Sequence, residues 1–184
     1  MSEQLEVLKA VSQRLSQAGI PYMVSGSVAM SFYAQPRMTR DIDIVVGLTP
    51  AAARRLPGLF SSDFYIDSDD VAEAVRDRGM FNIIHNASLV KVDFIIRKED
   101  AYRTTEFGRR RTVPVEGTPI IIVSPEDLLL SKLRWALDGD SKMQVEDARN
   151  IVLSRPDLDW GYLERWAGEL GVQDLLRQCQ GNAS

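Results

Sequence analysis

The sequence has a single cysteine, Cys179, and a single histidine, His85, among its 184 residues. A disulfide within the chain and a cysteine-rich zinc cluster both need more cysteines than this. One histidine also leaves little capacity for zinc catalysis or for a Ser/His/Asp triad, which depends on an imidazole base. Chemistry that uses carboxylates and a hard divalent cation stays open.

Long apolar runs and a dominant charge are absent as well. No segment approaches the roughly 20 apolar residues that cross a bilayer, and residues 2–7 lack the basic start and apolar stretch of a secretory signal. We therefore expect a cytoplasmic protein with no membrane contact. The 22 basic and 26 acidic residues give a net charge of -4, which disfavours charge-driven wrapping of nucleic acid but permits a local basic groove.

The chain length and the 45% of hydrophobic residues suit one folded core with a small helical extension. Apolar spacing and the positions of glycine and proline predict strands at 22–25, 41–46, 80–85, 89–96, 113–115 and 119–123. The same signals predict helices at 3–18, 28–33, 50–60, 69–77, 125–137, 142–153 and 160–178, the last interrupted at Gly171. Residues 97–111 are predicted to form a charged connection. We predict an α/β or α+β core at residues 1–123 and a helical portion at 124–184 packed on it.

Three aspartates stand in predicted strands, where aspartate is an unfavourable residue. Asp41 and Asp43 share one face of a strand because side chains alternate, and Asp93 interrupts a second apolar strand. If the two strands are neighbours, the three carboxylates converge on a magnesium site, and two metal ions there could bridge the attacking and leaving oxygens. Asp93 would then also accept a proton from an attacking hydroxyl. The alternative is that the acids mark the solvent face of an edge strand.

A glycine and a serine, Gly26 and Ser27, follow the short strand at 22–25 and precede a helix. Glycine lets backbone approach a phosphate closely, and a helix start offers N–H donors. Such pairs also fill ordinary turns, so the prediction depends on the thirteen residues that separate Ser27 from Asp41.

These segments together resemble the polymerase-β-type nucleotidyltransferase superfamily. The similarity is carried by Gly26-Ser27, by Asp41-Ile42-Asp43-Ile44, and by Val92-Asp93-Phe94. Thr39–Asp43, Phe81–His85, Lys91–Phe94 and Ser124–Leu133 look like small bacterial members, including relatives of AbiEii-type toxins. The resemblance implies a mixed-sheet core in which Asp41, Asp43 and Asp93 bind Mg²⁺. It further implies a nucleoside triphosphate at Gly26 and Ser27, and transfer of a nucleoside monophosphate to an acceptor hydroxyl.

In the AbiEii-type branch a helix lysine and a later acid complete the nucleotide site, and Lys132 and Asp147 occupy those places. For Lys132 the alternative is a solvated helix lysine, and for Asp147 a surface acid paired with Lys142 or Arg149. Arg40 either contacts the triphosphate or pairs with Asp41.

The acceptor is not defined by the sequence, and RNA and protein are the candidate acceptors. An antitoxin is a candidate binding partner. The basic run Arg109–Arg111 could guide an RNA acceptor or lie in a solvated loop. His85 is expected to be a packed, hydrogen-bonded residue. Two other functions remain open: a non-catalytic nucleotide-binding or toxin-antitoxin interaction module with the same fold, and a phosphohydrolase that uses the same metals on water.

Overall fold

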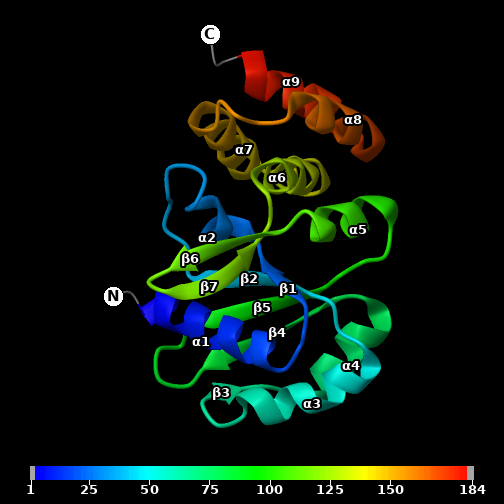
Figure 1. Ribbon diagram of the computed structural model, residues 1–184. Helices are drawn as coiled ribbons and strands as arrows, with labels where there is room; N and C mark the ends of the chain where they lie inside the picture. The colour runs from blue at the N-terminus through cyan, green and yellow to red at the C-terminus, as the bar shows by residue number, and fades with distance from the viewer. Residues whose placement is uncertain (1–2, 182–184) are drawn as a thin grey trace. The chain divides into compact units, whose positions relative to one another are not determined.

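A computed structural model describes residues 3–181 and has a mixed α/β architecture around a seven-stranded sheet in the order β3-β4-β5-β2-β1-β7-β6 (Figure 1). The strands are β1 (Tyr22–Val24), β2 (Asp41–Val46), β3 (Phe64–Tyr65), β4 (Met80–His85), β5 (Lys91–Ile96), β6 (Arg111–Val115) and β7 (Thr118–Ile122). The helices are α1 (Glu3–Gln17), α2 (Gly26–Met30), α3 (Pro50–Phe60), α4 (Ser68–Asp77), α5 (Ala101–Gly108), α6 (Pro125–Gly139), α7 (Lys142–Ser154), α8 (Trp160–Leu170) and α9 (Gln173–Gly181). The predicted fold class, with a mixed sheet flanked by helices, is confirmed.

The chain divides into two compact units. The first unit contains the residues up to Ser25 together with Met38–Ile122, and therefore the whole sheet. The second unit contains Gly26–Arg37 and the chain from Val123 onward. Residues 26–37 thus group with the carboxy-terminal helices, a long-range association that no local pattern signals. The predicted domains, 1–123 and 124–184, stay a prediction.

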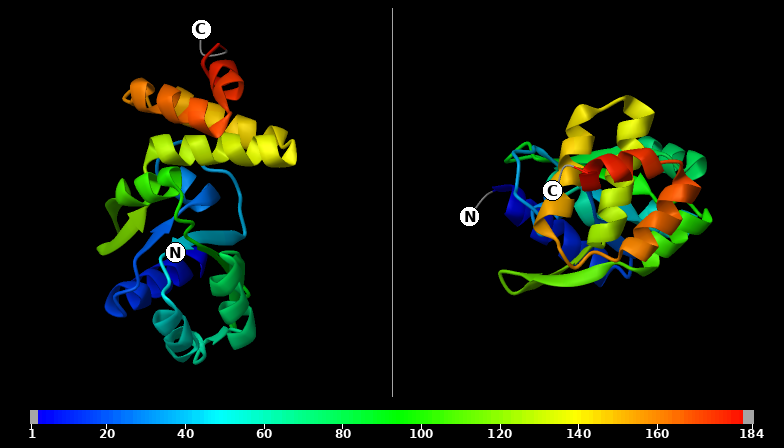
Figure 2. Two further views of the ribbon diagram at one scale, coloured as in Figure 1. Left: turned by 90° about the vertical axis from the view of Figure 1, so that its right-hand side faces the viewer. Right: turned by 90° about the horizontal axis from the view of Figure 1, so that it is seen from above.

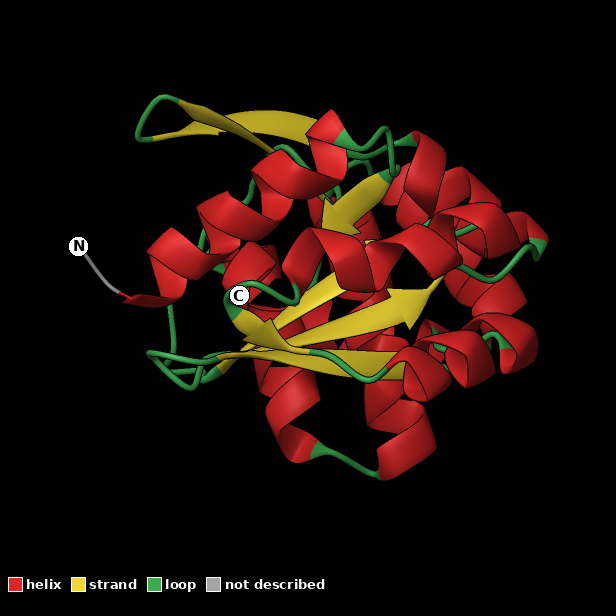
Figure 3. Ribbon diagram, turned by 90° about the horizontal axis from the view of Figure 1, so that it is seen from below, coloured by secondary structure: helices red, strands yellow, loops and turns green. Residues whose placement is uncertain are grey.

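The centre of the sheet is a parallel pair, β2 and β5, whose register runs from Asp41 opposite Lys91 to Val46 opposite Ile96. On one side β5 pairs antiparallel with β4, and on the other β2 pairs antiparallel with β1. Paired residues on neighbouring strands share a face, so this register decides which side chains meet. The β6–β7 hairpin continues the sheet beyond β1 as a two-stranded ribbon (Figure 3).

One face of β2 and β5 is apolar and forms the core of the first unit. Ile42, Ile44 and Val46 alternate along β2 and are buried. On β5, the ring of Phe94 stacks on Phe81 at 5.0 Å. Phe94 also meets Phe60 at 6.0 Å, so the end of α3 packs on this face. Aromatic pairs at such distances add to the burial of their apolar area, which anchors α3 to the sheet.

The second unit is a helical group in which α6 and α7 pack together and α8 and α9 pack against them (Figure 2). Helix α6 begins where the side chain of Ser124 accepts the N–H of Asp127, with Pro125 in the first turn, as helix-start chemistry predicts. Gly171, at φ 71°, ends α8 before α9 begins, so the predicted interruption at this glycine is confirmed.

The segment 97–111 is not only a charged connection, because it contains the helix α5. Asp100 caps this helix by accepting the N–H of Arg103, and Tyr102, Glu106 and Phe107 are its buried residues. The prediction was wrong here because two apolar residues among many charges are too few to show a helical period. The two-residue strand β3 was also missed, because two residues are too few to show the alternation of a strand. The helix after Ser25 is α2, which begins two residues before the predicted start at 28.

None of the helices within residues 3–181 has the length and apolar character to span a membrane.

Candidate active site

The three aspartates that the sequence singles out lie on neighbouring strands of the first unit. Asp41 and Asp43 share a face of β2, because both are in intermediate positions of an alternating pattern. Asp93 on β5 pairs directly with Asp43, and neighbouring strands lie about 4.8 Å apart. The two strands are therefore neighbours in register, as convergence of the carboxylates requires. They lie inside the sheet, so the alternative of an edge strand is wrong.

A row of polar residues crosses the sheet at the level of Asp43. Asn82 on β4 pairs with Asp93, and Asp93 pairs with Asp43. Beyond Asp43, the backbone N–H of Ser25 donates to the carbonyl oxygen of Asp43 at 2.8 Å. The sequence reasoning missed Asn82. The available signal was the apolar, polar, apolar order of Phe81, Asn82 and Ile83, and the burial along β4 places Asn82 on the exposed face.

Lys91 lies among the aspartates. It pairs with Asp41 across the two strands and precedes Asp93 by two positions on β5, so all three share one face. Its Nζ is 2.9 Å from Oδ2 of Asp93 and 3.3 Å from Oδ2 of Asp41. The hydrogen bond to Asp93, and then the charge of both carboxylates, raise the pKa of Lys91 although partial burial lowers it. We call Asp41, Asp43, Lys91 and Asp93 the carboxylate square.

The square is short of positive charge. Asp93 is almost fully buried, with 8% of its side chain exposed, and its buried Oδ1 has no hydrogen-bond partner among residues 3–181. Leaving a buried acceptor unsatisfied costs about 1–3 kcal/mol, and more when it is charged. Placing Asp43 beside Asp93 is a further unfavourable pairing of like charges. Lys91 brings one positive charge to the two carboxylates that it bridges, those of Asp41 and Asp93.

The donor types fit a magnesium ion, which prefers carboxylate oxygens and keeps several waters. The unpartnered Oδ1 of Asp93 is the observation in favour of that fit. As the side chains stand, however, no three His, Cys, Asp or Glu side chains within residues 3–181 are placed to hold a metal ion. Lys91 instead draws Asp41 and Asp93 together.

Gly26 and Ser27 begin α2 in the second unit. Gly26 adopts φ 62°, a left-handed conformation that glycine reaches without strain and other residues rarely adopt. Ser27 is buried. The tight turn predicted after β1 is therefore present, and in the chain it follows Ser25, whose N–H is bound to Asp43.

The second unit contains its own lysine and aspartate pair. Nζ of Lys132 is 2.7 Å from Oδ2 of Asp147, and these side chains are only 1% and 4% exposed. Nε of Arg37 lies 2.9 Å from Oδ1 of the same carboxylate. We call Lys132, Asp147 and Arg37 the Lys132 cluster. The alternatives of a solvated lysine, and of a surface acid paired with Lys142 or Arg149, are therefore wrong.

The remaining candidates from the sequence are Arg40, the basic run Arg109–Arg111 and His85. Arg40 is exposed, and the carboxylate of Asp41 is paired with Lys91. Within the predicted RNA-guiding run, the guanidinium of Arg110 stacks over the ring of Phe107 at 4.4 Å, while Arg111 is exposed at the start of β6. His85 hydrogen-bonds through Nδ1 to Oγ of Ser88 at 2.7 Å, as expected for a packed histidine.

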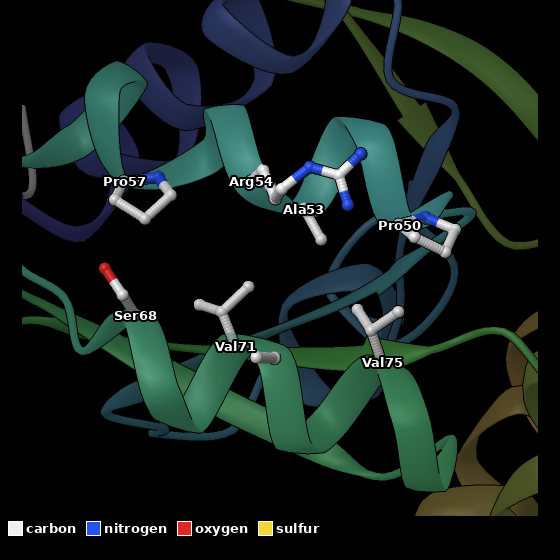
Figure 4. A pocket seen from close by; sticks show the side chains of 8 residues that line it. Pro50, Ala53, Arg54, Pro57, Ser68, Val71 and Val75 are labelled. Atoms are coloured by element: carbon white, nitrogen blue, oxygen red, sulfur yellow. The ribbon is translucent and has the colours of Figure 1, made fainter.

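A cavity of about 300 Å³ lies between α3 and α4. Figure 4 shows Val71 and Val75 of α4 directed toward the side of α3 that carries Ala53. Its lining is largely apolar, and Arg54 is its one charged residue. None of the square's residues lines it, so this cavity is separate from the candidate chemistry.

Comparison with solved structures identifies the fold. The chain is similar to an antigenic nucleotidyltransferase-like protein from Paracoccidioides brasiliensis, with 19% identity over 82% of this chain and 74% of that one, at a TM-score of 0.55. A candidate nucleotidyltransferase from Thermotoga maritima aligns at 19% identity over 78% and 91% of the two chains, with a TM-score of 0.54. The antibiotic-resistance factor ANT(2″)-Ia in solution aligns at 14% identity over 98% and 94%, with a TM-score of 0.55.

No protein-family model matches the sequence, and no curated protein matches it significantly. At identities below 20%, the structural likeness establishes a nucleotidyltransferase-like fold. The chemistry has to be argued from the residues of the chain itself, because one fold hosts many functions.

Proposed function

We propose that the protein is a magnesium-dependent nucleotidyltransferase that moves a nucleoside monophosphate from a nucleoside triphosphate to an acceptor hydroxyl. The observation that carries the proposal is the pairing of Asp43 with Asp93 in adjacent central strands, with Asp41 on the same face. Like charges on paired residues destabilise a sheet, and a Mg²⁺ ion bound between them would offset this repulsion. The nucleotidyltransferase-like fold supports the same reading.

Asp41 and Asp43 would hold the divalent cation, together with Asp93. A bound Mg²⁺ supplies charge that stabilises the transferring phosphoryl oxygens and orients the triphosphate. The chain's own contribution is to hold three acceptor groups on two rigid strands and to exclude water on the buried side of Asp93. Asp93 would also accept the proton of the acceptor hydroxyl, for which its unpartnered Oδ1 is a suitable atom.

Gly26, Ser27, Arg40 and Lys132 are the proposed contacts of the triphosphate. Gly26 fits this role best, because its positive φ provides a turn without a side chain next to the strand that leads to it. Arg40 is exposed and immediately precedes the acid pair. Lys132 fits least well, because its ammonium is already bound by Asp147 inside the second unit. A phosphate contact by Lys132 requires that this pair opens.

The acceptor, the toxin-like role and the cellular setting are finer parts of the proposal. RNA or protein is the proposed acceptor class, and the resemblance to AbiEii-type toxins suggests an antitoxin partner in the cytoplasm. The second candidate function is a non-catalytic nucleotide-binding or toxin-antitoxin interaction module. The Lys91 bridge favours this second candidate in one respect, since it leaves two of the three acids paired without a metal.

The test is incorporation of label from each α-labelled nucleoside triphosphate with Mg²⁺, offered to cellular RNA, to protein and to small aminoglycoside acceptors. Removing one acid with Asp41→Asn or Asp43→Asn should lower incorporation by about a thousandfold, since loss of metal-ion catalysis removes several kcal/mol of transition-state stabilisation. The melting temperature should change little.

Asp70→Asn is the matched control, because Asp70 is an exposed acid on α4, away from the sheet. It should retain full incorporation. A fully active Asp41→Asn/Asp43→Asn double variant would end the proposal. Tight binding of a triphosphate with Mg²⁺ but no pyrophosphate release with any acceptor would select the non-catalytic alternative, and free phosphate release without acceptor would select a phosphohydrolase.

A further inference from the structure

The carboxylate square has four corners on one face of two parallel strands. Asp41 and Asp43 occupy one edge on β2, and Lys91 and Asp93 occupy the opposite edge on β5. Strand spacing puts the corners about 4.8 Å apart across the strands and about 6.6 Å apart along them. Three corners are carboxylates and the fourth is an ammonium. Lys91 is therefore a direct neighbour of the acids on this face.

The ammonium of Lys91 contacts the same carboxylates that would bind a divalent cation. Its Nζ touches one oxygen of Asp93 and one oxygen of Asp41. The other oxygen of Asp93 is buried without a partner. A divalent cation bound to the same carboxylates would lie a few ångströms from the ammonium of Lys91, and two positive charges at such a distance repel each other. The lysine and the metal are therefore competitors for this position.

Lys91 can leave without a change in the sheet. Its side chain is 36% exposed, and a lysine ammonium is carried on a flexible four-carbon stem that moves into solvent readily. The backbone of β5 is held on both sides, by β2 and by β4. The exchange therefore needs only a side-chain rotation.

We propose that Lys91 is a positioning residue that serves as the resident cation of the square: it holds Asp41 and Asp93 together in the metal-free protein and is displaced when a divalent cation binds. This inference rests on the proposed metal-dependent function. It assigns to Lys91 a role in setting metal affinity, because each metal ion that binds must first displace the lysine. The orphan oxygen of Asp93 is where the incoming cation gains a contact that the lysine does not make.

The experiment compares Mn²⁺ binding to the nucleotide-free protein by the electron paramagnetic resonance signal of free Mn²⁺. Lys91→Met removes the charge and keeps a long side chain, and it should tighten Mn²⁺ binding about two- to fivefold, the scale of one partly exposed ion pair. Lys91→Arg restores a charge and should return the affinity toward that of the unaltered protein. Lys98→Met removes an exposed lysine just beyond β5 and should leave the affinity unchanged.

Melting temperatures give a second readout. In EDTA, Lys91→Met should melt about 2–4 °C lower than the unaltered protein, because Asp41 and Asp93 lose the ammonium that bridges them. With saturating Mn²⁺ the difference should vanish or reverse. A lysine with a merely structural role would lower the melting temperature equally in both conditions, and that result would overturn the inference.

The outcomes separate the inference from the proposed function. If the unaltered protein binds Mn²⁺, Asp93→Asn weakens this binding, and Lys91→Met binds no more tightly, then the inference fails and the metal site stands. If neither the unaltered protein nor Lys91→Met binds Mn²⁺ at millimolar concentration, the metal site itself fails and the inference fails with it. Binding by Lys91→Met alone would support the inference directly.

Discussion

The carboxylate square and the Lys132 cluster each contain a lysine paired with aspartate, but they differ in burial and in charge. In the Lys132 cluster, one buried carboxylate meets a lysine and an arginine, and both Asp147 and Lys132 are less than 5% exposed. In the square, Lys91 is 36% exposed and bridges two carboxylates, those of Asp41 and Asp93. The first arrangement is closed and rich in positive charge. The carboxylate square is partly exposed, and its four residues carry more negative than positive charge.

Under the proposed function, the difference separates an ion pair that supports the fold from one whose carboxylates would bind a metal ion. Burying two charges is tolerable only when their geometry and hydrogen bonds are complete, as around Asp147. Asp93 violates that condition with an unpartnered buried oxygen. A protein keeps such a violation at functional sites and rarely elsewhere. Four measurements break or sharpen this contrast, in order of decreasing effect.

The largest effect is expected from Asp147→Ala. Removing the carboxylate leaves the buried ammonium of Lys132 without its counter-ion, which should lower the free energy of unfolding by about 3–5 kcal/mol. Urea unfolding measures this change. The control is Asp138→Ala, which removes an exposed acid that pairs with Arg134 and should cost less than about 1 kcal/mol. Equal losses in the two variants would contradict the closed character of the Lys132 cluster.

The double variant Lys132→Met/Asp147→Leu tests whether the pair serves the fold alone. Well-packed apolar side chains can replace a buried ion pair with little or no loss, so this variant should recover at least about 2 kcal/mol of the stability that Asp147→Ala loses. Isothermal titration with a nucleoside triphosphate and Mg²⁺ then asks about function. Unchanged affinity in this folded variant would reject Lys132 as a triphosphate contact, and a clear loss would support it.

Asp93→Asn should have a much smaller effect on stability at the square. A neutral amide removes the repulsion with Asp43 but also the ion pair with Lys91, so the free energy of unfolding without metal should change by less than about 1 kcal/mol. Mn²⁺ affinity should fall at least about tenfold, because a charged ligand is lost. A destabilisation as large as that expected for Asp147→Ala would make the two clusters alike and remove the contrast.

The smallest effect is expected at a third, more exposed pair, Arg14 with Asp63, whose side chains are 27% and 36% exposed. The hydrogen bonds from Arg14 lower the pKa of Asp63 below its ordinary value. The resulting stability is present above the unfolded-state pKa of an aspartate, about 3.9, and is lost as the pH falls through the lower folded-state pKa. Solvent screening limits it to about 0.5 kcal/mol.

Comparing urea unfolding of the unaltered protein with Asp63→Asn at pH 7 and near pH 3 measures this contribution. The difference between the two proteins should be present at pH 7 and should shrink at the acid end. A difference that stays constant over this range would mean that the pair does not titrate as its hydrogen bonds indicate.

Much of the fold was visible in the order of residues because it depends on local rules. The alternation Asp41-Ile42-Asp43-Ile44 predicts a strand with one polar and one apolar face, and the structure has it. Ser124 and Pro125 mark a helix start, and Gly171 marks a helix end, at the positions where these occur. The helix α5 escaped prediction, since its two buried aromatic residues are surrounded by charges and it is secured by contacts with other elements.

The burial of Lys132 could not be predicted from the sequence. A lysine two residues after a leucine run is equally compatible with a solvated helix face. Its partner Asp147 is 15 positions away along the chain, and Arg37, which binds the same carboxylate, is 95 positions away. Their meeting depends on how α6 and α7 pack and on the association of residues 26–37 with the carboxy-terminal helices.

The amino-acid order is enough to establish which residues share a strand face and where turns and helix ends occur, since these follow from backbone geometry over a few residues. Only the tertiary structure shows which residues are neighbours across strands. It places β5 beside β2, pairs Asp43 with Asp93, and pairs Lys91 with Asp41. Strand order and register are set by the burial of a whole apolar face, including Phe60, Phe81 and Phe94, which are distant in the sequence. Burial of this apolar face therefore places the three aspartates side by side and brings Lys91 into contact with Asp41 and Asp93.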